Sequence, residues 1–561
     1  MKLKNILYSM MMGTAVLTGT TSCVSDLDQY PHTETTSKDV YTSLANYEAV
    51  LGKIYAAMVT SGQGKGGDNK DMESVLNKGA GFDYMRMFIN MQECGTDEFA
   101  STWLTGEQTT GLTYLSWDAN DAWVSDMYYR IYYNIALCNE FLRNANSASF
   151  SGADAEKMKE YKAEVRFMRA LFYYHALDFY RNIPMVTEND PVGSYIPPRY
   201  TPQQTFDYIE SELKDCVGDM LPASTCPYGQ ASQGAAYTLL AKLYLNSEVY
   251  TGVAKYAECK EACEKVMDMG YSLESDYSKL FNADNDKRTN EIIFALPVSA
   301  EHTVSWGSST YLVCGQVSMS NANQNVADYG VTAGWSEFRL RPEFVDKFTQ
   351  TDIDGNGDKR CKFFTNGQSK DVTSMTDETA GYLSEKWSNL KDDDTTAASN
   401  TADAGVETDF PLFRLADVYL MYAECVVRTV KDKKEWDDWA GGSDAESDSR
   451  KQGAIYWINK VRERAYGKDE NGNPKGQVWK ENFSSKDAFL QFILDERARE
   501  LYHEGYRRTD LIRYGQFTTN KYIWQWKGGT HDGQAVDSKY NIYPIPNTEL
   551  TANPNLHNDN Y

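Results

Sequence analysis

Residues 155–180 read AEKMKEYKAEVRFMRALFYYHALDFY, and this stretch decides the fold class of the chain. Its apolar and aromatic residues recur three and four positions apart, which places them on one face of an α-helix. The residues on that face are Val165, Met168, Leu171, Phe172, His175, Ala176 and Phe179. A helix with one such stripe packs it against a core, so the sequence predicts a long helix buried along one side.

The same periodicity recurs through the N-terminal half and again near the C-terminus. Further helices are expected over 44–59, 123–143, 201–220, 230–250, 254–269, 411–430, 451–466 and 485–503. Helix pairs joined by short links, repeating at roughly 35–45 residues, are typical of a tetratricopeptide-like solenoid. The predicted fold is therefore mainly α, with a tetratricopeptide-like helix-pair scaffold that forms an α-α superhelix.

Residues 271–408 have a different composition from the rest of the chain. Gly, Ser, Thr, Asn and Asp become frequent, and only short strand-like pieces stand out, at 291–297 and 310–313. Long irregular insertions in a regular scaffold commonly carry binding sites. We therefore expect a large irregular, loop-rich lobe in this part of the chain.

The first 23 residues have the plan of a bacterial export signal. Lys2 and Lys4 precede a short apolar stretch at 6–17, and small residues then lead to Cys23. A membrane span needs about 20 apolar residues, so this stretch is too short to be one. A cysteine at the expected cleavage point predicts lipid attachment to Cys23. The alternative is a secreted protein in which Cys23 is incidental.

These changes in composition divide the chain into five predicted segments. They are a signal peptide at 1–22, a lipidated tether at 23–40, an N-terminal helical tetratricopeptide-like scaffold at 41–270, a loop-rich binding region at 271–408 and a C-terminal helical region at 409–561. The roughly 540 residues left after processing are enough for a large core or for two packed lobes.

Charge and composition exclude several classes of function. The formal net charge of −24 repels nucleic-acid phosphates, and no basic patch with interleaved aromatic residues occurs. The cysteines other than Cys23 are scattered without a Cys-x-x-Cys pair, so neither a disulfide framework nor a zinc site is predicted. Aromatic residues make up 13% of a chain with a mean hydropathy of −0.58, which suggests that some rings serve a surface.

Three C-terminal segments resemble a known family. They are FRLADVYLMYAE at 413–424, DERARELYHEGYRRTDLIRY at 495–514 and YPIP at 543–546. In this order, and with Cys23 followed by Asp26-Leu27-Asp28, they resemble the SusD/RagB family of outer-membrane glycan-binding lipoproteins. Acidic and basic residues are interspersed at helical spacing in these segments, which predicts ion pairs within the scaffold rather than a ligand site.

The resemblance implies a function and partners. The chain would be anchored in the outer membrane by lipid on Cys23, would be exposed at the cell surface, and would capture a glycan without changing it chemically. A TonB-dependent outer-membrane transporter of the SusC kind would then receive the glycan. Residues 277–286 and 309–315 resemble the starch-binding members of the family, so the implied ligand is starch or maltooligosaccharide.

The resemblance also implies the binding residues. In starch-binding members an arc of aromatic rings cradles helical α-glucan. Here the arc falls on Trp103, Trp306 and Trp335, with a neighbouring arginine at Arg86. The three tryptophans lie in polar, loop-like sequence, which favours a ligand platform over a core position. A Trp face covers the C–H face of a sugar ring without desolvating its hydroxyls, and an arc of rings would select the coil of α-1,4-glucan.

Two positions depart from the family pattern. A second tryptophan near the first falls on Ser101, and a hydrogen-bonding asparagine falls on Gly106. The detailed contacts with a glucan are therefore open, and a SusD-like binder of a different glycan is an alternative.

No catalytic motif stands out in the chain. The histidines form no His-Glu-x-x-His array, and neither a Gly-x-Ser-x-Gly turn nor a Gly-rich phosphate loop occurs. We predict that the protein is not an enzyme and needs no cofactor. A glycosidase requires only two carboxylates about 5–9 Å apart, so a glycoside hydrolase is a second alternative. A protein-docking scaffold without a glycan site is a third.

One structural metal site is predicted. Asp284 and Asp286 lie in the segment that resembles the starch-binding members, and Asp409 would join them in the fold as a ligand of calcium. A second acidic loop, at 351–360, lacks the glutamate that an EF-hand needs at its twelfth position, so a solvated turn is favoured there.

Overall fold

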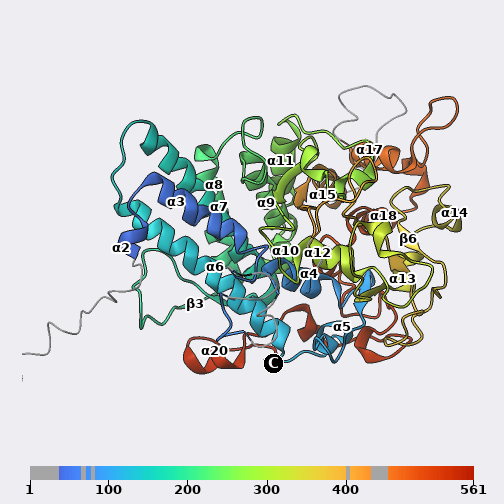
Figure 1. Cartoon of the computed structure of the whole chain (residues 1–561), viewed down its shortest axis with the longest axis horizontal. Helices are drawn as coiled ribbons and strands as arrows, with labels where there is room; N and C mark the ends of the chain where they lie inside the picture. The colour runs from blue at the N-terminus through green and yellow to red at the C-terminus, as the bar shows by residue number, and fades with distance from the viewer. Residues whose placement is uncertain (1–36, 63, 65–70, 77–81, 400–404, 431–452) are drawn as a thin grey trace, which may run out of the picture. The chain divides into compact units, whose positions relative to one another are not determined.

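The computed structural model describes residues 37–62, 64, 71–76, 82–399, 405–430 and 453–561 (Figure 1). Contacts divide the chain into residues 1–49 and 50–561, and each unit is described by itself. The first unit contains α2 (Ser37–Val40) and the beginning of α3 (Leu44–Ala56). The predicted lipid site at Cys23 and the export signal lie outside the described residues, and the five predicted segments stay predictions.

Helices dominate the second unit. They are α4 (Tyr84–Glu93), α5 (Thr110–Tyr114), α6 (Ala122–Ser147), α7 (Ala153–Tyr180), α8 (Pro202–Cys216), α9 (Gln233–Leu245), α10 (Ser247–Thr251), α11 (Tyr256–Met267), α12 (Ser308–Gly315), α13 (Pro342–Val345), α14 (Gln350–Ile353), α15 (Leu415–Thr429), α17 (Ala454–Tyr466), α18 (Lys486–Leu501), α19 (Arg507–Arg513) and α20 (Asn547–Ala552). The predicted mainly α fold is confirmed.

Neighbouring helices pack in sequence order through the scaffold. α6 packs on α7 and α7 on α8, side by side in Figure 1, while α9 packs on α11 and α11 on α15. α15 also contacts α17 and α18. The stripe predicted on 155–180 is buried in α7, with Val165, Leu171 and Phe179 fully inaccessible to water. Burial of this stripe holds α7 between its neighbours.

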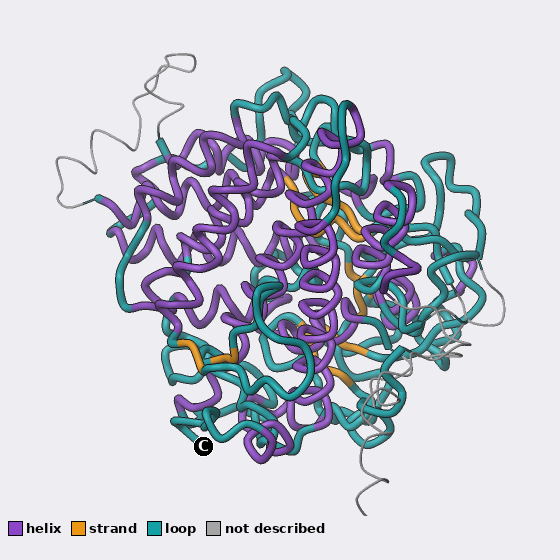
Figure 2. Tube along the Cα trace, turned by 90° about the vertical axis from the view of Figure 1, so that its left-hand side faces the viewer, coloured by secondary structure: helices purple, strands orange, loops and turns teal. Residues whose placement is uncertain are grey.

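In the described part of the chain, the strands form four small antiparallel sheets of two strands each, drawn in orange in Figure 2. The pairs are β1 (Phe99–Ser101) with β5 (Phe338–Leu340), β2 (Ile183–Pro184) with β3 (Arg199–Tyr200), β4 (Ile292–Leu296) with β8 (Phe410–Arg414), and β6 (Phe363–Phe364) with β7 (Leu383–Ser384). The β1–β5 and β4–β8 pairs join the irregular middle of the chain to the helical parts on either side of it.

Two local predictions were wrong, each because a tertiary contact outweighs local preference. Residues 310–313 lie in α12 and are not a strand, since all of α12 is buried and β-propensity yields to packing there. Residues 411–414 belong to β8 and not to a helix, because they pair with β4. The helix starts only at Leu415, whose N–H donates to the carbonyl oxygen of Glu291 at 3.0 Å. The strand predicted at 291–297 is confirmed as β4.

The family-like C-terminal segments form a buried network of ion pairs. Arg414 Nε lies 2.7 Å from a Glu504 oxygen, and its Nη1 lies 2.5 Å from Glu500 and 3.1 Å from Glu291. Arg464 also pairs with Glu291 and Glu500. The prediction that these charged residues belong to the scaffold is confirmed, because the side chains of Arg414 and its three partners are inaccessible to solvent.

Membrane-spanning helices and disulfide bonds are two further features to consider in the described part of the chain. Over the described ranges, no helix has both the length and the apolar character required to span a bilayer. The nine cysteines in the described part of the chain are free thiols, and most are buried. A buried free cysteine behaves as a small apolar side chain in the core.

Candidate functional site

Trp103 and Trp335 lie beside the same end of one small sheet. The last residue of β1 pairs with the first residue of β5. The backbone pairing continues one step further, where the N–H of Thr102 donates to the carbonyl oxygen of Glu337 at 2.8 Å. Trp103 follows this step and Trp335 lies shortly before it in the chain. Two tryptophans that are far apart in the sequence therefore leave the sheet at one edge.

Trp306, which lies just before α12, packs its ring beside that of Trp335. The ring centroids are 6.3 Å apart and the ring planes are inclined by 26°. Trp306 is 42% exposed and Trp103 is 37% exposed, while Trp335 is half-buried. The loops that carry Trp103, Trp306 and Trp335 thus meet at a water-accessible surface, hereafter the indole surface.

Arg86 lies beneath the indole surface and ties its loops together. It sits in the first turn of α4, where its N–H donates to the N-cap Asp83 at 2.9 Å. Its Nη1 donates to the carbonyl oxygen of Trp306 at 2.7 Å, and its Nη2 forms an ion pair with Glu107 and lies 3.5 Å from Glu337. Arg86 is only 1% exposed, so its guanidinium supports these loops from within and does not reach the water-accessible surface.

Glu107 connects Arg86 to the loop that carries Trp103. The N–H of Glu107 donates to the carbonyl oxygen of Trp103 at 3.0 Å. The carbonyl oxygen of Glu107 accepts a hydrogen bond from Trp123 Nε1 at 2.7 Å. Trp123 is buried in α6 and stacks on Phe82, with centroids 5.4 Å apart. The Trp103 loop is therefore fixed from below by both α4 and α6.

Asp83 fixes the loop that carries Trp306. Its carboxylate accepts hydrogen bonds from the Ser305 hydroxyl and, at 3.1 Å, from the Ser308 N–H. A Cβ atom at Gly307 would lie 2.3 Å from an Asp83 oxygen, so the close approach requires glycine there. The same contact begins α12, which explains why local β-propensity does not decide that segment.

Glu337 is a buried carboxyl group beside Arg86. Burial raises its pKa, Arg86 opposes that shift and Glu107 adds to it, and the resulting pKa is about 8. Its Oε1 accepts a hydrogen bond from the Ser101 hydroxyl at 3.1 Å. The raised pKa favours the neutral form of Glu337, which leaves Glu107 as the closer ion-pair partner of Arg86.

The two departures from the family pattern have different surroundings. Ser101 is buried in β1, where its hydroxyl donates to Glu337 and accepts a bond from Thr109 at 3.0 Å. This position supports the site and is not part of the exposed surface. Gly106 is exposed, and a Cβ atom there would meet only Cε3 of Trp103, at 3.7 Å. The structure leaves room for a side chain at Gly106.

Sequence reasoning missed the residues that support the tryptophans. Glu107 and Glu337 lie four and two residues after a predicted tryptophan, and this proximity is the one signal that could have drawn attention to them. It also missed Met319, which is 61% exposed and whose N–H donates to Ser336 Oγ at 2.7 Å, beside Trp335. Nothing in the sequence distinguishes Met319 from a core methionine.

The predicted calcium site at Asp284, Asp286 and Asp409 does not form. Asp284 Oδ1 is paired with Lys287 at 2.8 Å, and Asp409 accepts hydrogen bonds from the Tyr228 hydroxyl and from a backbone N–H, both at 2.7 Å. Within the described ranges, no group of three His, Cys, Asp or Glu residues could hold a metal ion. The prediction was wrong, and donors of the protein itself already engage the carboxylates of Asp284 and Asp409.

The acidic loop at 351–360 caps a helix. Asp352 and Thr349 form a reciprocal capping box at the start of α14, and Asp352 Oδ1 also accepts a hydrogen bond from the Asp358 N–H at 2.6 Å. A Cβ atom at Gly357 would lie 2.0 Å from that oxygen. The loop is therefore folded around Asp352, with backbone donors in place of a cation.

Trp306 and Trp335 offer near-parallel indole rings to water, held in place by helices and a small sheet beneath them. A family model described as SusD family matches residues 355–561, and a model described as starch-binding associating with outer membrane matches residues 27–245. The chain is 32% identical to the starch-binding protein SusD of Bacteroides thetaiotaomicron, across 99% of each chain. The chain therefore belongs to the SusD family, as its motifs predict.

Solved structures show the same fold. A SusD-like carbohydrate-binding protein from Bacteroides fragilis matches with a TM-score of 0.68 and 18% identity, over 92% of this chain and all of the other. Surface glycan-binding protein A from Bacteroides fluxus matches with a TM-score of 0.63 and 19% identity, over 91% and 97% of the two chains. As a family member, the protein is a non-catalytic, SusD-like glycan-binding protein associated with the outer membrane.

Proposed function

We propose that the protein captures starch-derived α-glucan oligosaccharides on the indole surface and hands them, chemically unchanged, to a TonB-dependent outer-membrane transporter of the SusC kind. The observation that carries the proposal is the pair of Trp306 and Trp335, which are nearly parallel and accessible to water. Identity of 32% with the starch-binding protein SusD along the whole chain supports starch as the ligand.

Inclined indole planes suit a curved chain of sugars. Covering about 100 Å² of apolar area on one ring contributes about 2.5 kcal/mol before any cost of ordering. The 26° between the planes of Trp306 and Trp335 matches a ligand whose successive sugars turn, as in α-1,4-glucan, better than a flat β-1,4-glucan. A flexible glycan loses conformational entropy on binding, so we expect dissociation constants on the order of micromolar to millimolar.

Arg86 acts in this proposal as a positioning residue. Its guanidinium bonds the carbonyl oxygen of Trp306 and pairs with Glu107, which in turn bonds the Trp103 backbone. The indoles are thereby held in place before ligand arrives. Such preorganisation strengthens binding because less entropy is lost when the complex forms.

We also propose that lipid on Cys23 anchors the protein, with the indole surface outside the cell. The export-signal plan of residues 1–22 and the outer-membrane association of the matched family support this location. Several acyl chains on one cysteine would hold a protein of this size at a membrane far better than one chain.

Electrophoresis of the mature protein through gels that contain polysaccharide tests the proposed specificity. We expect amylopectin and pullulan to retard the protein, and β-glucan and fructan to leave its mobility unchanged, because only the α-glucans present a coiled chain. A non-binding protein of similar size run in the same gels corrects for viscosity. Retardation by β-glucan with none by amylopectin would assign the surface to a different glycan.

Introducing a polar side chain at Gly106 should strengthen the binding of maltoheptaose. In Gly106→Asn the new amide lies beside the Trp103 ring, where the glycine leaves room for it. One added hydrogen bond is worth about 0.5–1.5 kcal/mol, so affinity for maltoheptaose should rise by roughly 2–10-fold in calorimetric titration. Gly106→Ala adds the same Cβ without a donor and should leave affinity unchanged. Equal effects of the two variants would contradict the explanation.

A further inference from the structure

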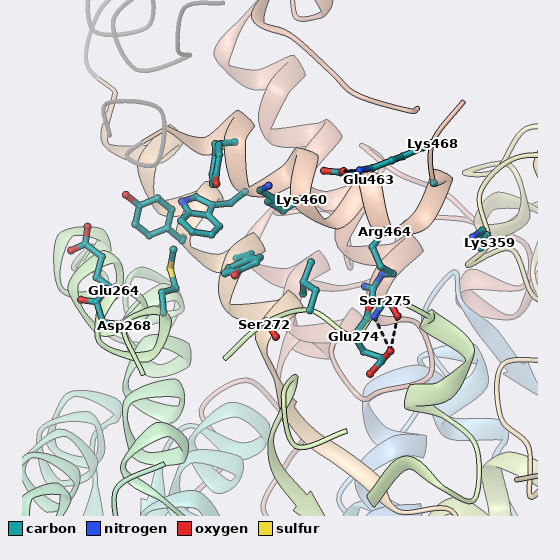
Figure 3. Close-up of a pocket in the computed structure, with 17 residues that line it drawn as sticks. Glu264, Asp268, Ser272, Glu274, Ser275, Lys359, Lys460, Glu463, Arg464 and Lys468 are labelled. Carbon is teal, nitrogen blue, oxygen red and sulfur yellow. Dashed lines mark hydrogen bonds and ion pairs between the residues drawn. The ribbon is translucent and has the colours of Figure 1, made fainter. Parts of the chain in front are cut away.

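A cleft of about 900 Å³ lies on α11, α15 and α17, and none of its lining residues belongs to the indole surface or to the contacts beneath it (Figure 3). α11 and α17 both pack on α15, so α15 forms the floor and the other two helices form the walls. Tyr419 and Tyr422 come from the floor, Tyr456 and Trp457 from the wall of α17, and Glu264 and Asp268 from the wall of α11. The volume is in the range of sites for small organic ligands.

Four aromatic rings gather in this cleft around Trp457. Its ring centroid lies 4.4 Å from that of Tyr419, 4.8 Å from that of Tyr456 and 6.3 Å from that of Tyr422. Tyr419 and Tyr422 are buried, whereas Tyr456 and Trp457 are half-buried and keep part of their surface open. The two buried tyrosines fix the indole, which then presents a rigid apolar platform to the cleft.

The two walls carry opposite charges. In Figure 3, Glu264 and Asp268 lie on one side of the cleft, and Lys460, Lys468 and Lys359 lie toward the other. The Nζ of Lys468 lies 3.7 Å from Glu463 and is therefore partly neutralised. Among the described residues, no ion pair engages Lys359, Lys460 or Asp268. Lys460 Nζ lies 5.2 Å from the centroid of the Tyr456 ring, and Glu264 is paired with Lys260 at 2.6 Å, so Lys359 and Asp268 are the charged lining groups without an ion-pair partner in the described part of the chain, across the aromatic floor.

We infer that this cleft is a second carbohydrate-binding site, which takes a neutral oligosaccharide independently of the indole surface. Four acidic and four basic side chains line it, so its formal charge is zero although the chain carries −24. An anionic ligand would meet the carboxylates of α11, and a cationic ligand would meet the lysines. Neutral hydroxyl groups both donate and accept, so they can bond both walls while the C–H face of a sugar covers Trp457.

The test uses the mature chain with the indole surface removed. In the triple variant Trp103→Ala, Trp306→Ala, Trp335→Ala, calorimetry with maltoheptaose, cellohexaose and mannohexaose at up to about 10 mM covers the weak affinities expected of such sites. We expect at least one of these sugars to bind with a stoichiometry near one. Adding Trp457→Ala should weaken that binding about tenfold or more, equivalent to about 1.4 kcal/mol.

Two further variants separate ligand binding from folding. Lys460 is exposed, so Lys460→Ala should fold normally and weaken binding by about threefold through loss of a charged donor. Trp479, 44% exposed and outside the cleft lining, provides the matched control, because Trp479→Ala also removes an indole and should leave the affinity unchanged.

The outcomes distinguish this site from the indole surface. If the triple variant binds none of the three sugars, or binds one with an affinity that neither Trp457→Ala nor Lys460→Ala changes, the second site is refuted. If the wild type binds maltoheptaose and the triple variant does not, the proposed function of the indole surface stands and maltoheptaose has no second site in the cleft. If the triple variant keeps the wild-type affinity and Trp457→Ala abolishes it, the cleft is the site and the indole surface is not.

Discussion

Maltoheptaose binding is expected to fall below detection when Trp306 and Trp335 are both replaced by alanine. Each indole contributes about 2 kcal/mol of apolar burial against a sugar face, so each single variant should lose roughly 30-fold in affinity. Their rings lie 6.3 Å apart, and in the proposed function they contact neighbouring sugars of one chain. If the two losses add, the double variant should lose roughly 900-fold, which places its binding below the limit of calorimetric titration at millimolar ligand.

The single variants report on geometry as well as on area. Trp306 is 42% exposed and contacts its support through its backbone carbonyl, so Trp306→Ala leaves the bond from Arg86 in place. Trp306→Tyr keeps a smaller aromatic face in the same loop and should recover part of the lost affinity. Trp479→Ala removes an exposed indole elsewhere and should bind as the wild type does. Unchanged melting temperatures would confirm that the scaffold is intact.

One result would contradict the site assignment. If the double variant binds maltoheptaose within about threefold of the wild type, a difference of less than 1 kcal/mol, the two indoles do not contact the glucan. Binding of the protein to starch would then have to be sought on another surface, whatever the similarity of the chain to its relatives.

Helix positions could be predicted from sequence wherever periodicity and burial agree. The stripe from Val165 to Phe179 specifies α7 because an apolar face at helical spacing has one low-energy solution, which is to pack against a core. Residues 310–313 could not be assigned in this way. Their β-branched side chains favour a strand locally, but Asp83, which is distant in the sequence, bonds the start of α12 and fixes a helix.

The candidate site was predictable in its residue types but not in its construction. A resemblance pointed to Trp103, Trp306 and Trp335, yet only the β1–β5 pairing brings the loops of Trp103 and Trp335 to one edge. Long-range pairing of three-residue strands leaves almost no periodic signal. The burial of Arg86 could not be predicted either, because the sequence around an arginine near a binding loop does not show whether its side chain faces solvent or pairs with Glu107.

Replacing Arg414 by methionine is expected to destabilise the protein by about 4 kcal/mol, since removal of one partner from a buried ion pair typically costs 3–5 kcal/mol. Methionine keeps a similar length of apolar chain, so the effect reports lost charge and hydrogen bonds more than a cavity. Glu291, Glu500 and Glu504 would remain buried with one guanidinium fewer. Chemical denaturation followed by circular dichroism measures the change.

The pH dependence of the stability loss in Arg414→Met identifies the cause of that loss. Burial alone would raise the pKa of Glu500, but Arg464, Arg414 and Arg360 together lower it from 4.5 to about 2. A carboxyl group whose pKa is lowered on folding stabilises the protein above its ordinary pKa, and this stabilisation is lost as the pH falls toward the folded value. The deficit of Arg414→Met should therefore be largest near neutral pH and should shrink between about pH 4.5 and pH 2 as Glu500 becomes neutral.

Arg143 supplies the matched control for charge loss at a surface. Its guanidinium pairs with Glu140 at 2.8 Å on α6, and both side chains are about one-third exposed. Exposed pairs of this kind contribute about 0–1 kcal/mol, so Arg143→Met should change stability little at any pH. Equal losses in the two variants, or a deficit of Arg414→Met that persists unchanged down to pH 2, would mean that packing and not buried charge dominates this network. The C-terminal motif would then act through shape, and its mixed signs would be incidental to stability.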